Sequence, residues 1–266
     1  VVELSKNSNG GTDDAKDNIS LFFIFKNMGI LSSSYLKGYL IDVISIKSIF
    51  MIASGTPLLM VLAGLIMNEE KCKPEVIESD EEASPLVEKK DIKTEFFNFM
   101  FQKQTLIPIA FIILFMAPPS YDDPLFYFLT NELKFNGNIL GQMSFASAIT
   151  AIIAVYLYKL YFKHVPFRKV LVVGSILYSI FSFSAYALVT RLNKEIGISD
   201  YLLSLFSSST TNLLAELVMM PILSLACILC PKKLEATVYS VFMSAINLGA
   251  IISYLEASFL TNYLDI

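Results

Sequence analysis

Charged side chains inside long apolar runs are the residues of this sequence best placed to do chemistry. Glu216 has leucine or valine at the next two positions C-terminal to it, Lys26 follows five consecutive apolar residues, and Asp122 comes shortly after two adjacent prolines. An ionisable group inside a bilayer costs at least ~2.5 kcal/mol on insertion scales, so it marks a solute cavity, a proton route or a buried pair. These side chains are therefore candidates for solute binding or proton transfer. The alternatives are a structural ion pair or a long side chain that reaches the headgroups.

The apolar runs that carry these charges have the length of membrane-crossing helices. The chain has 266 residues, of which 55% are hydrophobic, and its mean hydropathy is +0.59. About 20 apolar residues match the ~30 Å hydrocarbon core, and a chain in lipid must pair its backbone groups internally. The sequence therefore predicts an all-α, polytopic membrane helix bundle in a lipid bilayer. The expected crossings are residues 21–41, 47–67, 105–130, 137–160, 167–190, 200–229 and 236–263.

The polar segments divide the predicted bundle. Residues 1–20 are expected to be a polar disordered segment, and residues 68–103 an acidic linker whose aromatic end forms a short interfacial helix. The linker separates two helices (21–67) from five helices (104–266). The segment 105–130 contains Pro118, Pro119 and Pro124, so it cannot be one straight helix.

Lysine and arginine placement predicts the orientation of the bundle. With the acidic linker in the cytosol, the short joints on the same side carry most of the basic residues: Lys159, Lys163, Arg168, Lys169, Lys232 and Lys233. Fewer basic residues fall on the other side: Lys47, Lys134, Arg191 and Lys194. This bias agrees with the rule that cytosolic loops are enriched in positive charge.

Small residues at every fourth position predict close helix packing in the last crossing. Ala245, Gly249, Ser253 and Ala257 form one stripe over three turns. Because lipid is as apolar as leucine, membrane helices associate through the close approach that such residues allow.

Several other function classes have little support. Cys227 and Cys230 have CxxC spacing, but there is no second cysteine pair and only one histidine, so a zinc site lacks ligands. No GxSxG, HExxH or Walker A motif occurs, and no basic patch is interleaved with aromatic residues. We therefore expect no enzyme, no metal, no cofactor and no nucleic-acid partner.

Three motifs carry a resemblance to a known family. They are Cys230-Pro231 followed by Glu235-Ala236-Thr237 and Asn247-Leu248-Gly249; Ala117-Pro118-Pro119 with Asp122 and Phe126-Tyr127-Phe128; and the joint from Tyr158 to Arg168. The chain resembles the folate–biopterin transporter family, a branch of the major facilitator superfamily, over about residues 21–266. Two departures are Pro124, where the family has a small residue, and Leu133-Lys134-Phe135 in place of Leu-Gly-Phe, which is expected to stiffen that joint.

The resemblance implies a partial major facilitator fold and a transport function. Family members have about twelve helices, so this chain would correspond to helices five to eleven. The implied function is proton-coupled secondary transport of folates or pterins, with two halves that rock about a midplane cavity.

The resemblance and the chemistry of folate, which is flat, aromatic and anionic, suggest roles for named residues. The expected substrate-binding residues are Asp122, Phe126, Tyr127, Glu216, Asn247 and Lys26. The aromatic rings would stack on the pteridine, Asp122 would bind its amino-pyrimidine edge, and Lys26 would meet a carboxylate. Asp122 and Glu216 are expected to share one cavity, and Arg168 and Glu235 to act at a cytosolic gate.

Two other functions remain open at this point. The chain is a carrier for another organic solute, or a membrane receptor or scaffold that transports nothing. Charges inside the crossings favour transport, because a scaffold has little use for Glu216 in the middle of a span.

Overall fold

The computed structural model describes residues 12–66, 92–230 and 234–264. Within these residues the regular structure is helical and contains no strand. The helices are α2 (Thr12–Val43), α3 (Ile46–Ile66), α4 (Ile92–Met100), α5 (Lys103–Met116), α6 (Asp122–Tyr127), η1 (Phe128–Glu132), α7 (Gly137–Leu157), η2 (Tyr158–Phe162), α8 (Phe167–Val189), α9 (Leu192–Glu195), α10 (Asp200–Leu229) and α11 (Glu235–Tyr263). The two η elements are π-helical turns.

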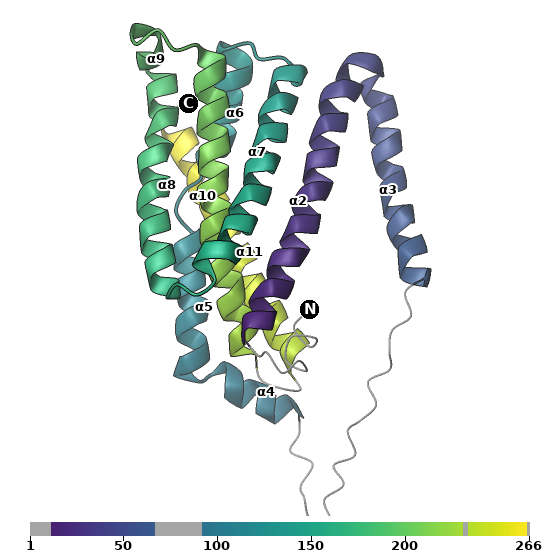
Figure 1. Cartoon of the computed structure of the whole chain (residues 1–266), viewed down its shortest axis with the longest axis vertical. Helices are drawn as coiled ribbons and strands as arrows, with labels where there is room; N and C mark the ends of the chain where they lie inside the picture. The colour runs from purple at the N-terminus through teal and green to yellow at the C-terminus, as the bar shows by residue number, and fades with distance from the viewer. Residues whose placement is uncertain (1–11, 67–91, 231–233, 265–266) are drawn as a thin grey trace, which may run out of the picture.

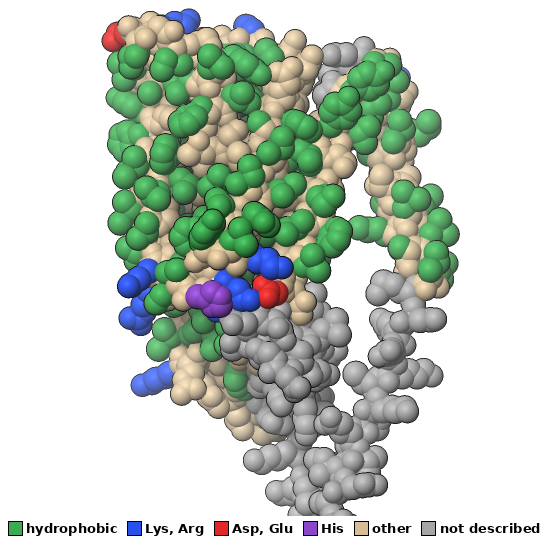
Figure 2. All heavy atoms as spheres, in the orientation of Figure 1, with side chains coloured by type: hydrophobic (Ala, Val, Ile, Leu, Met, Phe, Trp, Pro, Cys, Tyr) green, Lys and Arg blue, Asp and Glu red, His purple; other side chains and the backbone are tan. Residues whose placement is uncertain are grey.

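Six helices of the described chain are long and apolar enough to cross a membrane. They correspond to α2, α3, α7 with η2, α8, α10 and α11, and all but α3 stand roughly parallel in one bundle (Figure 1). Hydrophobic side chains cover the bundle surface, whereas lysine and arginine gather mainly near its lower end (Figure 2). The prediction of an all-α, multi-pass membrane protein is confirmed.

The predicted crossing at 105–130 is broken rather than continuous. Helix α5 ends at Met116, and α6 starts only at Asp122 and passes directly into the turn η1. Proline has no backbone N–H to donate, and its ring excludes the preceding turn of a helix. The expected break at Pro118-Pro119 is therefore confirmed. Helix α5 has 14 residues, too few to span the bilayer alone, so the predicted crossing at 105–130 consists of α5, the break, α6 and η1.

Helix α2 starts earlier than the sequence predicted. Residues 12–20 were expected to be disordered, yet they form the first turns of α2. Ile19 and Ser20 are buried, and Asp17 and Lys163 form an ion pair of 2.7 Å. Tertiary contacts therefore stabilise a segment whose composition alone favours disorder. Residues 1–11 lie outside the described residues.

The acidic linker is described only at its end. Residues 67–91 lie outside the described part of the chain, so the disorder expected there is not tested. The expected short helix is present as α4, which lies across the lower end of the bundle (Figure 1).

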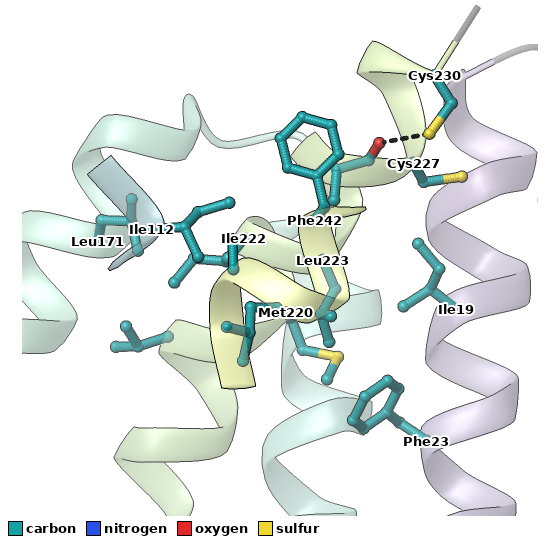
Figure 3. Close-up of a cluster of buried hydrophobic side chains, with 14 of the residues drawn as sticks. Ile19, Phe23, Ile112, Leu171, Met220, Ile222, Leu223, Cys227, Cys230 and Phe242 are labelled. Carbon is teal, nitrogen blue, oxygen red and sulfur yellow. Dashed lines mark hydrogen bonds between the residues drawn. The ribbon is translucent and has the colours of Figure 1, made fainter. Parts of the chain in front are cut away.

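Helix α10 is the central element of the bundle. More than half of its apolar stretch is buried, and α2, α7 and α8 all pack against it. Figure 3 shows the core that it forms with its neighbours: Met220, Ile222 and Leu223 of α10 lie with Ile112 of α5 and Phe242 of α11. Ile19 and Phe23 bring α2 into the same core.

The two helices in 21–67, α2 and α3, differ in how they meet the rest of the chain. Helix α2 packs directly on α7 and α10, because its lower turns bury Ile19 and Phe23 in the core. Helix α3 instead stands apart from the bundle, and none of its apolar stretch is buried (Figure 1).

The small-residue stripe of α11 is the packing face that the sequence predicted. Ala245, Gly249, Ser253 and Ala257 are all buried. A Cβ atom at Gly249 would lie 2.5 Å from Met116 Cβ and 2.9 Å from the Ile113 carbonyl oxygen of α5. Only glycine permits this approach.

Lys134 has a left-handed backbone conformation that favours glycine, the residue that the family resemblance leads one to expect there. Its φ is +55°, in the left-handed region, where a side chain costs about 1–2 kcal/mol. The joint Leu133-Lys134-Phe135 therefore carries strain that a glycine would not.

We predict that Gly249→Ala destabilises the protein by about 1–3 kcal/mol, because the added methyl group meets backbone atoms of α5. Thermal unfolding in detergent, followed by far-UV circular dichroism, measures the effect. Gly29→Ala is the matched control, since nothing lies within 4 Å of its Cβ position on α2. An unchanged unfolding temperature for Gly249→Ala would contradict the close α5–α11 contact.

We predict that Lys134→Gly stabilises the protein by about 0.5–1 kcal/mol. The relief of left-handed strain exceeds the entropy that glycine adds to the unfolded chain. The same unfolding assay applies, with Lys169→Gly as the control, because Lys169 lies inside α8 and glycine there weakens a helix. A lower unfolding temperature for Lys134→Gly would show that the Lys134 side chain matters more than its φ.

Candidate functional site

Glu216 sits in the middle of α10 and contacts α2. Its Oε1 accepts a hydrogen bond of 3.0 Å from Asn27 Nδ2, and the Asn27 side chain is almost fully buried. The Glu216 side chain is 15% exposed. A carboxylate and a carboxamide therefore meet between two helices at mid-span, where hydrogen bonding compensates for lost hydration.

Lys26 supplies positive charge at the same place. Its Nζ lies 3.9 Å from Glu216 Oε1 and 4.5 Å from the centre of the Phe23 ring. The lysine side chain is 44% exposed, so the contact leaves the ammonium group open on one side. Lys26, Asn27 and Glu216 together form what we call the mid-span cluster.

Hydroxyl and amide side chains form hydrogen bonds between α7 and the upper half of α10. Thr150 Oγ1 donates to the Ser209 carbonyl oxygen at 2.9 Å, and Asn212 Nδ2 donates to the Ser147 carbonyl oxygen at 2.7 Å. These bonds satisfy polar groups without water. They hold the helix that carries Glu216 at a fixed height and rotation against α7.

Asp122 lies at a different hollow, next to the break in the chain. It is exposed, and its Oδ2 accepts a hydrogen bond of 2.8 Å from Ser120 Oγ. The hollow has a volume of about 610 Å³ and is lined by the broken segment 118–122 and by α5, α8, α10 and α11. Tyr178 of α8 and Ser253 of α11 add polar groups to its wall.

The structure does not bring Asp122 and Glu216 into one cavity, contrary to the expectation. Ala215, Val218 and Met219 of α10 line the hollow at Asp122, and Glu216 is not among its lining residues. At 3.6 residues per turn, Glu216 points about 100° around the α10 axis from its neighbour Ala215, and its carboxylate meets Asn27 of α2 instead. Each acid therefore belongs to its own site.

The other predicted site residues are exposed, except Glu235, whose side chain the structure does not describe. Phe126 and Tyr127 of α6 are 50% and 61% exposed, with their ring centres 6.0 Å apart. Asn247 is exposed on α11, and Arg168 is exposed at the start of α8. Glu235 is the first residue of α11, and its side chain lies outside what the structure describes. The predicted gate role of Arg168 and Glu235 is therefore not tested.

The sequence analysis did not identify two residues of α2 that make contacts with other helices, Asn27 and Asp17. Asn27 follows Lys26 directly, and its amide inside an apolar run was the signal that could have identified it. Asp17 lay in the segment expected to be disordered, but it pairs with Lys163 at the end of η2. Lys16 Nζ also donates to the Lys163 carbonyl oxygen at 2.9 Å. These contacts join the lower end of α2 to the chain that follows α7 and η2.

A metal site is absent from the described residues. Within 12–66, 92–230 and 234–264, no three histidine, cysteine, aspartate or glutamate side chains gather closely enough to hold an ion. Cys227 and Cys230 are buried in the apolar core (Figure 3). The chemistry available at the mid-span cluster is therefore charge pairing, hydrogen bonding and proton exchange.

Known proteins with similar sequences are carriers by name. The chain is 31% identical over 239 residues to the folate-biopterin transporter of Synechocystis sp., which covers 90% of this chain and 47% of that protein. It is 31% identical over 268 residues to folate transporter 1 of Plasmodium falciparum, covering 100% of this chain and 50% of that protein. A probable folate-biopterin transporter 5 of Arabidopsis thaliana is 26% identical over 258 residues, covering 93% and 49%.

The chain spans about half the length of the curated relatives it matches. No solved structure matches it. The model of the BT1 family matches residues 2–266. The chain therefore belongs to the BT1 family, that of the folate–biopterin transporters.

Proposed function

We propose that the intact protein is a secondary carrier that moves folates or pterins across a membrane by alternating access, coupled to protons. The observation that carries this proposal is the mid-span cluster, in which Glu216 of α10 meets Asn27 and Lys26 of α2. Charged groups at this depth are costly and mark solute and proton pathways. The names of the relatives supply the solute class.

Lys26 is the proposed contact for a substrate carboxylate. Its ammonium group is 3.9 Å from Glu216, beyond ideal hydrogen-bond length, and is partly exposed. A second anion can therefore approach it without first displacing a tight bond. Folate carries carboxylates and biopterin does not, so Lys26 distinguishes the two solutes.

Glu216 is the proposed proton carrier. When Glu216 binds a proton it no longer holds Lys26 by charge, and the ammonium group is then free to pair with the incoming carboxylate. When the proton leaves, the Glu216 carboxylate competes for Lys26 and favours release. For folate, one proton thus accompanies each cycle, because each half-step exchanges one negative partner of Lys26 for another.

The contact between α2 and the remaining helices is the proposed moving interface. By the family resemblance, α2 belongs to the first half of a major facilitator fold and α5 to α11 belong to the second. Ile19 and Phe23 and the Asp17–Lys163 pair close this interface at the end rich in basic residues. Opening that end requires these contacts to separate, as in carriers whose halves rock about a central site.

We predict that Glu216→Gln reduces folate uptake at least tenfold and removes its dependence on external pH. The substituted amide keeps an oxygen that accepts the bond from Asn27, but it cannot exchange a proton. Uptake of labelled folate by vesicles that contain the intact protein, measured at several pH values, tests this. Glu195→Gln is the matched control, since Glu195 is exposed on the short helix α9. Unchanged uptake with an unchanged pH profile would make Glu216 structural.

We predict that Lys26→Met weakens folate uptake about tenfold, or ~1.4 kcal/mol, while biopterin uptake changes less than about twofold. Methionine keeps the apolar stem against Phe23 and removes the charge. Competition between labelled biopterin and unlabelled folate measures the ratio directly. Equal losses for both solutes would exclude a carboxylate contact at Lys26.

The uptake assay also includes the variant Asp122→Asn, which tests the other candidate site, and a labelled amino acid, which tests the solute class. A loss of uptake in Asp122→Asn but not in Glu216→Gln would move the substrate site to the hollow beside the broken segment. Uptake of the amino acid alone would favour a carrier for another solute. Failure of every solute to enter, in a protein that inserts and folds, would favour a receptor or scaffold.

A further inference from the structure

Another hollow lies between α2, α7 and α10, away from both Asp122 and Glu216. Its volume is about 650 Å³, which is within the range of ~300–1,000 Å³ typical of small-molecule pockets. The α2 residues that line it come from the C-terminal part of that helix, at the end opposite to the Asp17–Lys163 pair. In Figure 1 this is the upper end of the bundle, which the distribution of basic residues assigns to the non-cytosolic side.

Aromatic rings form one wall of this pocket. Tyr35 and Tyr39 of α2 are 66% and 61% exposed, so both rings have open faces. Phe145 of α7 meets Tyr35 with ring centres 6.2 Å apart and planes inclined by 55°. Exposed rings of this kind stack on flat heterocycles, and such stacking tolerates many ring types.

Two carboxamides form the polar part of the same pocket. Tyr201 donates its hydroxyl hydrogen to Gln142 Oε1 at 2.7 Å, and Gln142 Nε2 donates to Asn138 Oδ1 at 3.3 Å. This chain of bonds orients both amides. An amide offers a donor and an acceptor side by side, which is how asparagine and glutamine bind the edge of adenine.

None of the described residues that line the pocket is charged. The aromatic rings and the two carboxamides suit a flat, hydrogen-bonding ring. Lys26, which we assign to the carboxylate, lies nine residues before Tyr35 on α2, about 14 Å along the helix axis. Helix α2 thus contributes residues to both the pocket and the mid-span cluster, at different heights in the bundle.

We propose that this pocket is an outer binding site for the pteridine ring of pterins and folates, used before the solute reaches the mid-span cluster. The proposal rests on the proposed function for its solute class. It adds a recognition step for the ring that is separate from the recognition of charge.

Binding of biopterin to the purified intact protein in lipid nanodiscs tests the site, with quenching of pterin fluorescence as the signal. We expect Tyr35→Ala and Gln142→Leu each to weaken biopterin binding about tenfold. Tyr35→Phe should bind like the unsubstituted protein, because it keeps the ring. Tyr161→Ala is the matched control, since Tyr161 is exposed but lies on η2, outside the pocket.

Competing ligands separate the ring from the tail. p-Aminobenzoyl-glutamate, which has the carboxylates of folate without the pteridine, should compete equally well in Tyr35→Ala and in the unsubstituted protein. Lys26→Met should show the reverse pattern. Equal weakening of both ligands by Tyr35→Ala would overturn a ring-specific site.

A second measurement does not depend on affinity. A cysteine in place of Ala146, which lines the pocket, should react with a membrane-impermeant maleimide several-fold more slowly when biopterin is present. A cysteine in place of exposed Glu195 should show no protection, and the unsubstituted protein corrects for native cysteines. No protection at position 146, in a protein that binds biopterin, would place the ring elsewhere and overturn the proposal.

The two proposals fail in different ways. Saturable uptake of folate or biopterin that is indifferent to every pocket substitution refutes the outer site and leaves the carrier function intact. Pterin binding that depends on Tyr35 and Gln142, in a protein that accumulates no solute in vesicles, refutes the carrier function and keeps the site.

Discussion

The arrangement of the bundle depends on the contacts that Glu216, a carboxylate in the middle of a membrane helix, makes with α2. Glu216 cannot face lipid cheaply, so α10 must turn this position toward a helix that offers donors. Asn27 and Lys26 of α2 supply them. This contact fixes the height and rotation of α2, and it thereby decides which of its residues reach the core and which remain open.

Three zones along α2 follow from that registration. At the lower end Ile19 and Phe23 are buried in the core, and Asp17 pairs with Lys163. The mid-span cluster occupies the centre. At the upper end the exposed rings of Tyr35 and Tyr39 line a pocket. The proposed alternating-access mechanism assigns a separate role to each of these three zones.

The helices of the bundle pack on one another by contacts suited to lipid. Gly174 admits Val218 and Gly249 admits Met116 at distances that no larger residue permits. Thr150 and Asn212 bond α7 to α10 through backbone carbonyls. Since burial of apolar surface gives little gain between helices in lipid, close approach and hydrogen bonds stabilise the bundle. Pro118 and Pro119 break the crossing at 105–130, and a hollow lies beside Asp122.

The sequence alone determined the fold class, because apolar runs of membrane length have only a helical solution in lipid. It also identified the break at Pro118-Pro119, the packing stripe of α11 and the family. The tertiary structure decided which charges meet. Asp122 and Glu216 are both acids in or beside apolar runs, yet Asp122 lies at a hollow and Glu216 contacts α2, because the direction of a side chain depends on helix rotation against its neighbours. The same reason makes residues 12–20 helical and gives Asn27 its role: each depends on contacts with residues far away in the chain, at Lys163 and Glu216.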